Sequence, residues 1–328
     1  MGQLVNLREY PTAAYRDVTA PNADTLYSST FVDVTEEPWI ISWPAMGDRY
    51  YVWEFYSAWV PVIFDPGSRT TGQKAQTYAI TGPNWKGTLP EGVVEQKSPT
   101  GLVWILARTY CDGSPKDYAA VHALQDQYKL TPLSSYGKTY SPPKGKIDTS
   151  VDMKMSVRDN VNALDAETYF NRMAQLMVNN PPRAEDAPMV EKLTKLGVVA
   201  GKEFDLSKFP KEISAAIEEG TKEAWQQIVA YTKNAGEIHN GWTLNMKIGH
   251  YGTDYMARAW LSAFGIPANA PKDAVYLFRE TDATGKPLDA TTNKYVMHFK
   301  SKSDLPPANG FWSLTMYDTG WFFIANPL

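Results

Sequence analysis

An amide and a carboxylate stand at alternate positions in Asn22-Ala-Asp-Thr-Leu-Tyr-Ser28, just before an apolar run. Side chains at alternate positions of an extended segment face the same way, so Asn22 and Asp24 are predicted to point together. A carboxylate placed beside an amide could act as a general base or acid. The alternative is an Asx turn that leads into the strand, which is a common use of both residue types and is favoured by the chemistry of the segment alone.

Two arginines occupy positions that suit the binding of an anionic group. Arg69 lies in the turn Asp65-Pro-Gly-Ser-Arg-Thr-Thr-Gly72, where backbone amides could assist its planar guanidinium. The alternative for Arg69 is a surface ion pair with an acidic neighbour. Arg108 ends the apolar run Leu102-Val-Trp-Ile-Leu-Ala-Arg, so it is predicted to be half-buried and to need an acidic partner or an anionic ligand. Trp104 lies on the same face of that strand, and such a pair suits a sugar, an organic acid or an ordinary core edge.

A second polar cluster comprises Tyr251, Asp254, Tyr255 and Arg258. Asp254 and Arg258 are one helical turn apart, so on a helix they could form an ion pair on one face. We interpret this cluster as a candidate ligand-binding surface, with an intrahelical ion pair as the alternative.

Histidine offers little further chemistry. His239 and His250 flank a stretch rich in Gly and Asn. We interpret them as solvent-facing or hydrogen-bonded loop histidines in preference to a metal-binding or proton-transfer pair. The sequence carries no Walker loop, no nucleophile elbow, no His-Glu-x-x-His and no dinucleotide fingerprint. We therefore predict no cofactor and no metal site.

The elements that position the N-terminal candidates are predicted to be strands. Short runs rich in β-branched and aromatic residues alternate with Pro- and Gly-containing turns, a pattern typical of a sandwich or barrel. The predicted strands cover Phe31–Val34, Trp39–Trp43, Tyr50–Tyr56, Trp59–Phe64, Gln76–Thr81 and Leu102–Thr109.

The pattern changes to a helical period after residue 115. Apolar spacing predicts helices over Lys116–Leu130, Leu164–Asn179, Ala184–Leu196, Pro210–Asn234 and Tyr255–Phe264. A Pro- and Gly-rich loop is predicted over Tyr136–Ser150, and a hairpin or loop over Gly236–Gly252. Strands are expected again over Ala274–Thr281, Lys294–Lys300, Gly310–Tyr317 and Trp321–Ala325.

These elements predict an α+β protein with three parts. Residues 1–135 form a β-rich sandwich or barrel with a closing helix, residues 136–265 a linker and a helical segment, and residues 266–328 a partial C-terminal β domain. The polar candidates fall in the first part and at the end of the helical one. If the two β domains face each other, Asn22, Asp24, Arg69 and Arg108 could line a cleft with Trp104 and Tyr27.

The composition of the chain limits the kinds of partner that it can bind. The 328 residues include 32 basic and 36 acidic side chains, giving a net charge of −4 with no basic block, which argues against nucleic acid. No apolar run reaches the roughly 18 residues of a membrane span, so no membrane insertion is predicted. Cys111 is the only cysteine, which excludes an internal disulfide and a multi-cysteine zinc site.

Several blocks in the chain also resemble a known family. They are Asn22–Ser28, Gly47–Tyr51, Pro66–Gly72, Leu102–Arg108, Ala119–Asp126, Tyr251–Tyr255, Asp273–Tyr276 and Phe311–Asp318. In this order they are similar to the bacterial family with paired domains of unknown function 1254 (N-terminal) and 1214 (C-terminal). The resemblance implies an N-terminal β-rich domain, a helical middle and a C-terminal jelly-roll-like domain, but no reaction.

The resemblance also bears on the ends of the chain and on its location. Family members carry a helical segment before the Asn22 block and continue beyond Asn326, so we expect a chain shortened at both ends or a short relative. The family implies a periplasmic or secreted protein, whereas Met1–Asn6 lacks the basic segment and apolar core of a signal peptide.

Three functions are compatible with the sequence. The first is a hydrolase of a small polar substrate, a sugar or an organic-acid ester, with Asp24 as general acid or base and with Arg69 and Arg108 stabilising negative charge. Its ligand contacts would be Asn22, Tyr27, Trp104, Tyr251, Asp254, Tyr255 and Arg258. The second is a non-catalytic binding protein that uses the same pocket. The third is an assembly protein whose C-terminal sheet pairs with another copy to form a homo-oligomer.

Overall fold

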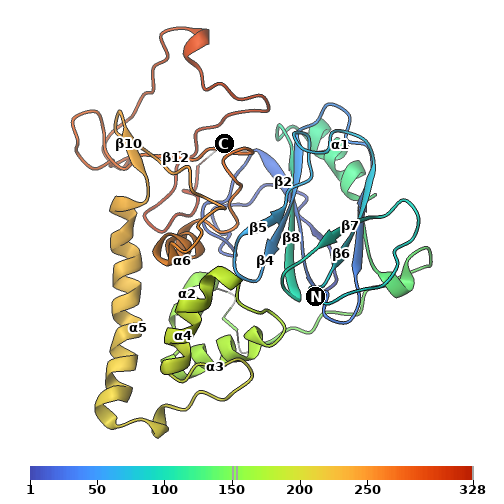
Figure 1. The fold of residues 1–328 in the computed structure, drawn as a ribbon. Coiled ribbons are helices and arrows are strands. Elements are labelled where there is room, and N and C mark those ends of the chain that lie inside the picture. The colour runs from blue at the N-terminus through green and yellow to red at the C-terminus, as the bar shows by residue number, and fades with distance from the viewer. Residues whose placement is uncertain (150, 153, 327–328) are drawn as a thin grey trace.

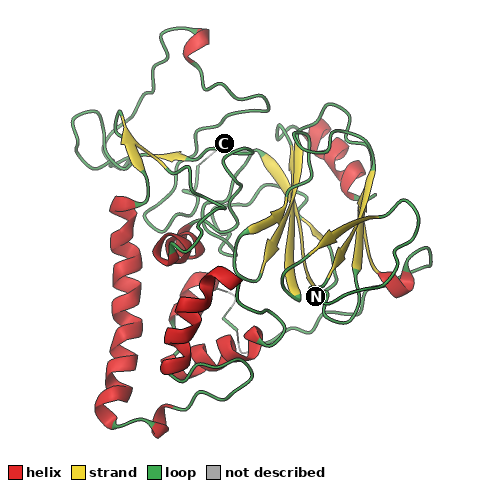
Figure 2. Ribbon diagram, viewed as in Figure 1, coloured by secondary structure: helices red, strands yellow, loops and turns green. Residues whose placement is uncertain are grey.

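The computed structural model describes residues 1–149, 151–152 and 154–326. It confirms the predicted α+β class: strands fill the N-terminal part, helices fill the middle, and the last part is mostly irregular (Figures 1 and 2). Ser150, at the end of the predicted loop over residues 136–150, lies outside the described residues.

Two sheets form an open sandwich in the N-terminal part. Sheet A has the strand order β1-β2-β8-β4-β5, with every neighbouring pair antiparallel. Its strands are β1 (Val5–Asn6), β2 (Thr25–Asp33), β8 (Leu102–Tyr110), β4 (Tyr51–Ser57) and β5 (Val62–Phe64). Sheet B has the order β7-β6-β3-β9, and only its β6–β7 pair is parallel. Its strands are β7 (Val94–Lys97), β6 (Gln76–Thr81), β3 (Trp39–Trp43) and β9 (Lys129–Pro132).

The core of the sandwich follows from strand alternation, because successive side chains of a strand point to opposite faces. In β8, Val103, Ile105 and Ala107 point between the sheets and are fully buried. Sheet B contributes aromatic rings to the same core, and the Trp43 indole stacks on that of Trp53 at 5.0 Å. The intervening residues of β8, including Arg108, must therefore lie on the opposite face of sheet A.

Helices cover the end of the sandwich and build the middle of the chain. Helix α1 (Pro115–Gln125) begins at Ser114, whose side chain accepts a hydrogen bond from the Asp117 N–H, and it packs Val121 against Leu26. The other helices are α2 (Val157–Asn162), α3 (Ala166–Met177), α4 (Ala187–Lys195), α5 (Lys211–Tyr231) and α6 (Tyr255–Phe264). Single 3-10 turns occupy Leu133–Ser135, Ala184–Asp186, Leu206–Lys208, Thr232–Asn234 and Lys302–Asp304.

The predicted helix over residues 116–130 is too long. It ends at Gln125, and residues 129–132 form β9 instead, because this short segment pairs with β3 from Trp39 to Ser42.

The predictions for the C-terminal strands are mostly wrong. Of the expected runs, only Leu277–Phe278 (β12) forms a strand among the described residues, and it joins β10 (Glu237–His239) and β11 (Trp242–Leu244) in sheet C. The runs at 294–300, 310–317 and 321–325 are irregular, apart from a bridge between Tyr317 and Phe323.

The C-terminal part nevertheless lies beside sheet A (Figure 1). Phe311 packs against Tyr50 and Tyr110, and the Tyr317 hydroxyl donates to the Pro21 carbonyl at 2.6 Å. These contacts place the segments at Phe311 and Tyr317 beside the face of sheet A that points away from sheet B. We call this face, carried by Thr25, Tyr27, Ser29, Phe31, Val52, Glu54, Tyr56, Trp104, Leu106, Arg108 and Tyr110, the cleft face.

Candidate functional site

A buried ion pair occupies the centre of the cleft face. Arg108 of β8 and Glu54 of β4 stand on neighbouring strands, and the Nε of Arg108 donates to Oε2 of Glu54 at 3.0 Å. The two side chains are only 9% and 1% exposed. Burying two charges is costly even when they are paired, so this pair is weak evidence for stability and a reason to look for another role.

Arg108 has two further contacts. One Nη donates at 3.4 Å to the hydroxyl of Tyr27, which stands directly opposite on β2, and the guanidinium lies 5.3 Å from the Tyr27 ring. The other Nη donates to the Pro267 carbonyl at 2.9 Å. The guanidinium therefore joins sheet A to the chain that follows α6.

The Tyr27 hydroxyl has an unusual environment. Its oxygen accepts from the Asn22 backbone N–H at 3.1 Å, from Asn22 Nδ2 at 2.6 Å and from Arg108. The orientation of the Asn22 amide is fixed, because its Oδ1 accepts from the backbone N–H groups of Asp24 and Thr25. All three partners of the Tyr27 oxygen can only donate, so within the described part of the chain the Tyr27 O–H proton has no acceptor.

Residues 267–276 form the opposite wall. The Tyr56 hydroxyl donates to the Ala268 carbonyl at 3.3 Å, and the Asn269 backbone N–H donates to the Tyr276 hydroxyl at 3.3 Å. Asn269 is 3% exposed, and its Oδ1 is buried with no partner in the described residues. A buried amide oxygen without a donor costs free energy, which indicates a missing partner.

Burial perturbs the titration of the groups in this cluster. Desolvation raises the pKa of the Glu54 carboxyl, and the Arg108 charge opposes that shift. Desolvation also raises the pKa of the Tyr56 phenol, and the nearby Glu54 carboxylate raises it further. Burial is the largest single influence on the pKa of Arg108 and lowers it, but the charge of Glu54 together with the neighbouring phenols of Tyr27, Tyr276 and Tyr56 raises that pKa by more, so Arg108 stays cationic.

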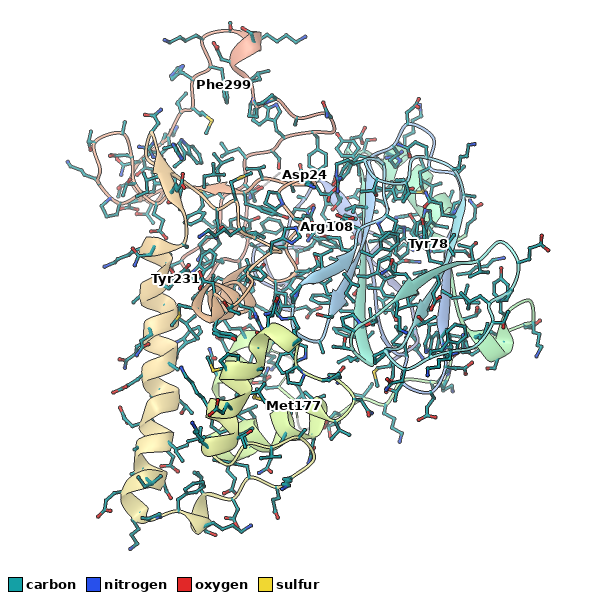
Figure 3. The ribbon with its side chains drawn as sticks, in the orientation of Figure 1. Asp24, Tyr78, Arg108, Met177, Tyr231 and Phe299 are labelled. Atoms are coloured by element: carbon teal, nitrogen blue, oxygen red, sulfur yellow. The ribbon has the colours of Figure 1, made fainter. Side chains whose placement is uncertain are left out.

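Arg108, Tyr27, Asn269 and Tyr276 line part of a large open cleft, whose walls are sheet A, the C-terminal part and residues of α2, α3, α5 and α6. It encloses about 5240 Å³, whereas a pocket for one small ligand encloses roughly 300–1000 Å³. The corner around Arg108 is therefore one subsite of a wider cleft. Figure 3 shows Arg108 and Asp24 on this side of the sandwich and Tyr78 between the sheets.

The predicted residues of the N-terminal part divide into two groups. Asn22, Tyr27 and Arg108 come together as described. Trp104 lies two residues along β8 on the same face, where its indole donates to Ser29 and stacks on Phe31 at 5.3 Å.

Asp24 and Arg69 also line the cleft but have other partners. Asp24 accepts from the Ser313 hydroxyl at 2.7 Å, and burial raises the pKa of its carboxyl. Asn22 forms the Asx turn that the sequence left as an alternative. Arg69 donates to Asp273 at 2.7 and 2.8 Å and to Asp65 at 3.1 Å, which ties the turn at residues 65–72 to the C-terminal part.

The second predicted cluster is a structural junction. The intrahelical ion pair between Asp254 and Arg258, which was the alternative to a ligand-binding surface, does not form, because Asp254 is the N-cap of α6 and its Oδ1 accepts from the Ala257 N–H. Arg258 instead binds Asp186, which also receives a two-pronged contact from Arg183. The two remaining members flank this junction: Tyr255 lies under the Arg258 guanidinium at 5.2 Å, and Tyr251 is buried beside α6.

Sequence reasoning missed Glu54, Asn269 and Tyr276. Glu54 had a signal: it is the one charged residue in the apolar run Tyr51-Val-Trp-Glu-Phe-Tyr-Ser57, as Arg108 is in its own strand. Two opposite charges, each alone in an apolar strand, favour a buried pair. Asn269 and Tyr276 had no such signal, because only tertiary packing brings residues 267–276 against sheet A.

The described residues offer neither a metal site nor a membrane-spanning helix. No three His, Cys, Asp or Glu side chains gather there as a set of metal ligands. None of the described helices has both the length and the apolar character required to cross a bilayer.

The fold and the cleft define an α+β protein with an N-terminal β-sandwich that faces an irregular C-terminal part. Residues 1–132 match the family model described as "Protein of unknown function (DUF1254)", and residues 273–328 match "Protein of unknown function (DUF1214)". The two matches occur in the order of the predicted pairing, which confirms the resemblance predicted from the sequence.

One solved structure supports the same architecture. The crystal structure of the VPA0106 protein from Vibrio parahaemolyticus is similar with a TM-score of 0.66 and 22% sequence identity, over 97% of this chain and 74% of that chain. At this identity the likeness concerns the fold alone. No curated protein matches the chain.

Proposed function

We propose that the protein binds a small polar ligand in the cleft, with Tyr27 and Arg108 as the hydrogen-bond donors that hold it. The observation that carries this proposal is the Tyr27 O–H, which three donors surround and no described acceptor receives. A phenol held this way presents its proton to an incoming oxygen atom. Arg108 adds a guanidinium whose orientation is fixed by Glu54 and Pro267.

The surroundings of this corner suit a small molecule. Concave sites with several aromatic rings and a few convergent polar groups are where proteins bind small ligands. Trp104, Tyr110 and Phe311 supply such rings along the same cleft. The rings offer apolar contact, and the polar groups fix the orientation of the ligand.

The test is a thermal-shift screen of the purified protein against sugars, organic acids, esters and amides, followed by titration of each hit. Tyr27→Phe removes only the hydroxyl, so we expect it to weaken binding about 3- to 10-fold, the effect of one hydrogen bond. Tyr136→Phe is the matched control, because Tyr136 is exposed and follows the 3-10 turn at residues 133–135, outside the cleft lining. Hits that bind both variants equally would contradict the proposal.

A second candidate function is hydrolysis of a small ester or glycoside in the same cleft. The observation that favours it is the raised pKa of Glu54, since burial favours the protonated form of the carboxyl, which a general acid requires. Asp24, whose pKa is also raised and which lines the cleft, is the other candidate acid or base.

Mass spectrometry of each mixture before and after overnight incubation distinguishes the two functions. A hydrolase consumes a stabilising compound, whereas a binding protein leaves it unchanged. Glu54→Gln and Asp24→Asn then identify the acid–base group, because only the variant that lacks it loses turnover by orders of magnitude. A product that forms at the same rate in both variants would rule out this chemistry.

A further inference from the structure

The subsite around Arg108 has more free donors than free acceptors. A guanidinium carries five N–H donors, and three of those of Arg108 are used by Glu54, Tyr27 and Pro267. The remaining N–H groups of Arg108 and the Tyr27 O–H have no acceptor within the described ranges. A ligand that satisfies them must bring an acceptor oxygen.

An unpartnered side-chain acceptor lies on the opposite wall. The Oδ1 of Asn269 is buried and unpartnered among the described residues, while the Asn269 backbone N–H is used by Tyr276. Unpaired buried acceptors are rare in folded proteins, so Asn269 points to a ligand that also carries a hydroxyl or N–H donor.

The charge of the subsite argues against an anion. Arg108 is neutralised by Glu54, and Arg69 by Asp273 and Asp65. Asp273 is near enough to Glu54 to raise the pKa of that carboxyl further. The two cations are thus matched by three carboxyl groups, and a carboxylate ligand would have to compete with Glu54 for the guanidinium.

Building on the proposed binding function, we infer that the ligand is a neutral carbonyl compound, an ester or an amide, that also carries a hydroxyl or N–H group. Its carbonyl oxygen accepts from Tyr27 and Arg108, and its donor group binds Asn269. The aromatic rings of the cleft favour an apolar or aromatic remainder. A free carboxylate of the same shape binds more weakly.

The experiment compares matched probes by ligand-observed NMR and titration calorimetry at constant ionic strength. Methyl mandelate, mandelamide and sodium mandelate share a phenyl ring and a hydroxyl and differ in charge. We expect the ester and the amide to bind at least about tenfold more tightly than the carboxylate. Methyl phenylacetate lacks only the hydroxyl of methyl mandelate, so it probes the contact with Asn269.

Two variants make the test specific. Tyr27→Phe should weaken both esters about 3- to 10-fold. Asn269→Ala should weaken methyl mandelate by a similar factor and leave methyl phenylacetate unchanged, because that ester has no donor for Oδ1. Circular dichroism and thermal melting confirm that each variant is folded, and the two variants report on the site independently.

The outcomes separate this inference from the proposed function. The inference is overturned if the protein binds mandelate more tightly than the ester and the amide. It is also overturned if sugars bind in a Tyr27-dependent way while neither the esters nor the amide bind. In both cases the proposed function, binding of a small molecule, still stands. Equal loss of both esters in Asn269→Ala overturns the role of Asn269 and with it the requirement for a donor group. If neither the mandelate series nor the wider screen contains a ligand, the proposed function fails together with the inference.

Discussion

Replacing Arg108 by Met should destabilise the protein strongly. Met keeps much of the apolar length of the side chain but removes the cation, which leaves Glu54 buried, charged and without its partner. Breaking a buried ion pair from one side costs about 3–5 kcal/mol, a large share of the roughly 5–15 kcal/mol that stabilises a typical domain. The loss of the contacts with Tyr27 and Pro267 acts in the same direction.

The cost of Arg108→Met should depend on pH through Glu54. Burial raises the pKa of the Glu54 carboxyl in the folded protein, and Arg108 is the main group that lowers this pKa. The charge of Asp273 raises the pKa of Glu54 further, whereas the hydrogen bond with the Tyr56 phenol lowers it. Without Arg108 the pKa of Glu54 rises further. A carboxyl whose pKa is higher in the folded than in the unfolded state stabilises the fold at low pH, and this contribution is lost as pH rises through the folded value. The cost should therefore be larger at pH 8 than at pH 5.

Urea unfolding followed by tryptophan fluorescence measures this cost, since the chain contains 11 tryptophans. The matched control is the double variant Glu54→Leu with Arg108→Met. Apolar replacement of both partners of a buried pair is often neutral or stabilising, so the double variant should recover most of the loss. A cost below about 1 kcal/mol for Arg108→Met at pH 8, or a double variant no more stable than the single one, would refute the reasoning.

Three further predictions concern the scaffold. Arg49 lowers the pKa of Asp117 from 3.8 to about 2. This shift corresponds to about 2 kcal/mol of stability, which is present above pH 4 and lost as pH falls through 2. In thermal melts, the Asp117→Asn variant should therefore be less stable than the parent protein at pH 5, and the difference should disappear as pH falls to 2. Ser114→Ala should cost about 1 kcal/mol in urea unfolding, because it removes the N-cap of α1, and an unchanged midpoint would exclude that role. Gly67→Ala should lower the melting temperature at a cost of about 1–3 kcal/mol, since a Cβ there would lie 2.5 Å from a backbone oxygen of β4. The control Gly220→Ala in α5, where a Cβ meets no atom within 4 Å, should instead raise stability by about 0.5–1 kcal/mol.

The sequence predicted elements whose signal is local. Trp39–Trp43, Gln76–Thr81 and Tyr255–Phe264 form with the predicted bounds, because their apolar patterns agree with their surroundings. Strand β7 was missed because its residues, Val94–Lys97, are mostly exposed and polar, and only pairing with β6 makes them a strand. The prediction of a strand at residues 294–300 was wrong for the reverse reason. The composition of this segment suits a strand, but no described strand pairs with it.

The same distinction applies to the site. Arg108 was predicted to be half-buried and to need an acidic partner or an anionic ligand, because a guanidinium at the end of an apolar strand requires one or the other. The identity of that partner, Glu54, depends on which strands are neighbours, and sheet A places β4 beside β8 across a long stretch of chain. Asp254 and Arg258 had suitable spacing for an ion pair, but the helix begins at Asp254, and its side chain is used there as a cap.

The contacts of sheet A with residues 267 and 268 have a consequence for biosynthesis. Arg108 reaches a carbonyl 159 positions later in the chain, and Tyr56 reaches one 212 positions later. All the strands of the sandwich precede these carbonyls in the chain and therefore leave the ribosome before them. Such distant contacts form slowly. The corner around Arg108 can therefore be completed only after residues 267 and 268 have emerged, and a nascent chain arrested before residue 267 would lack the carbonyls that Arg108 and Tyr56 bind.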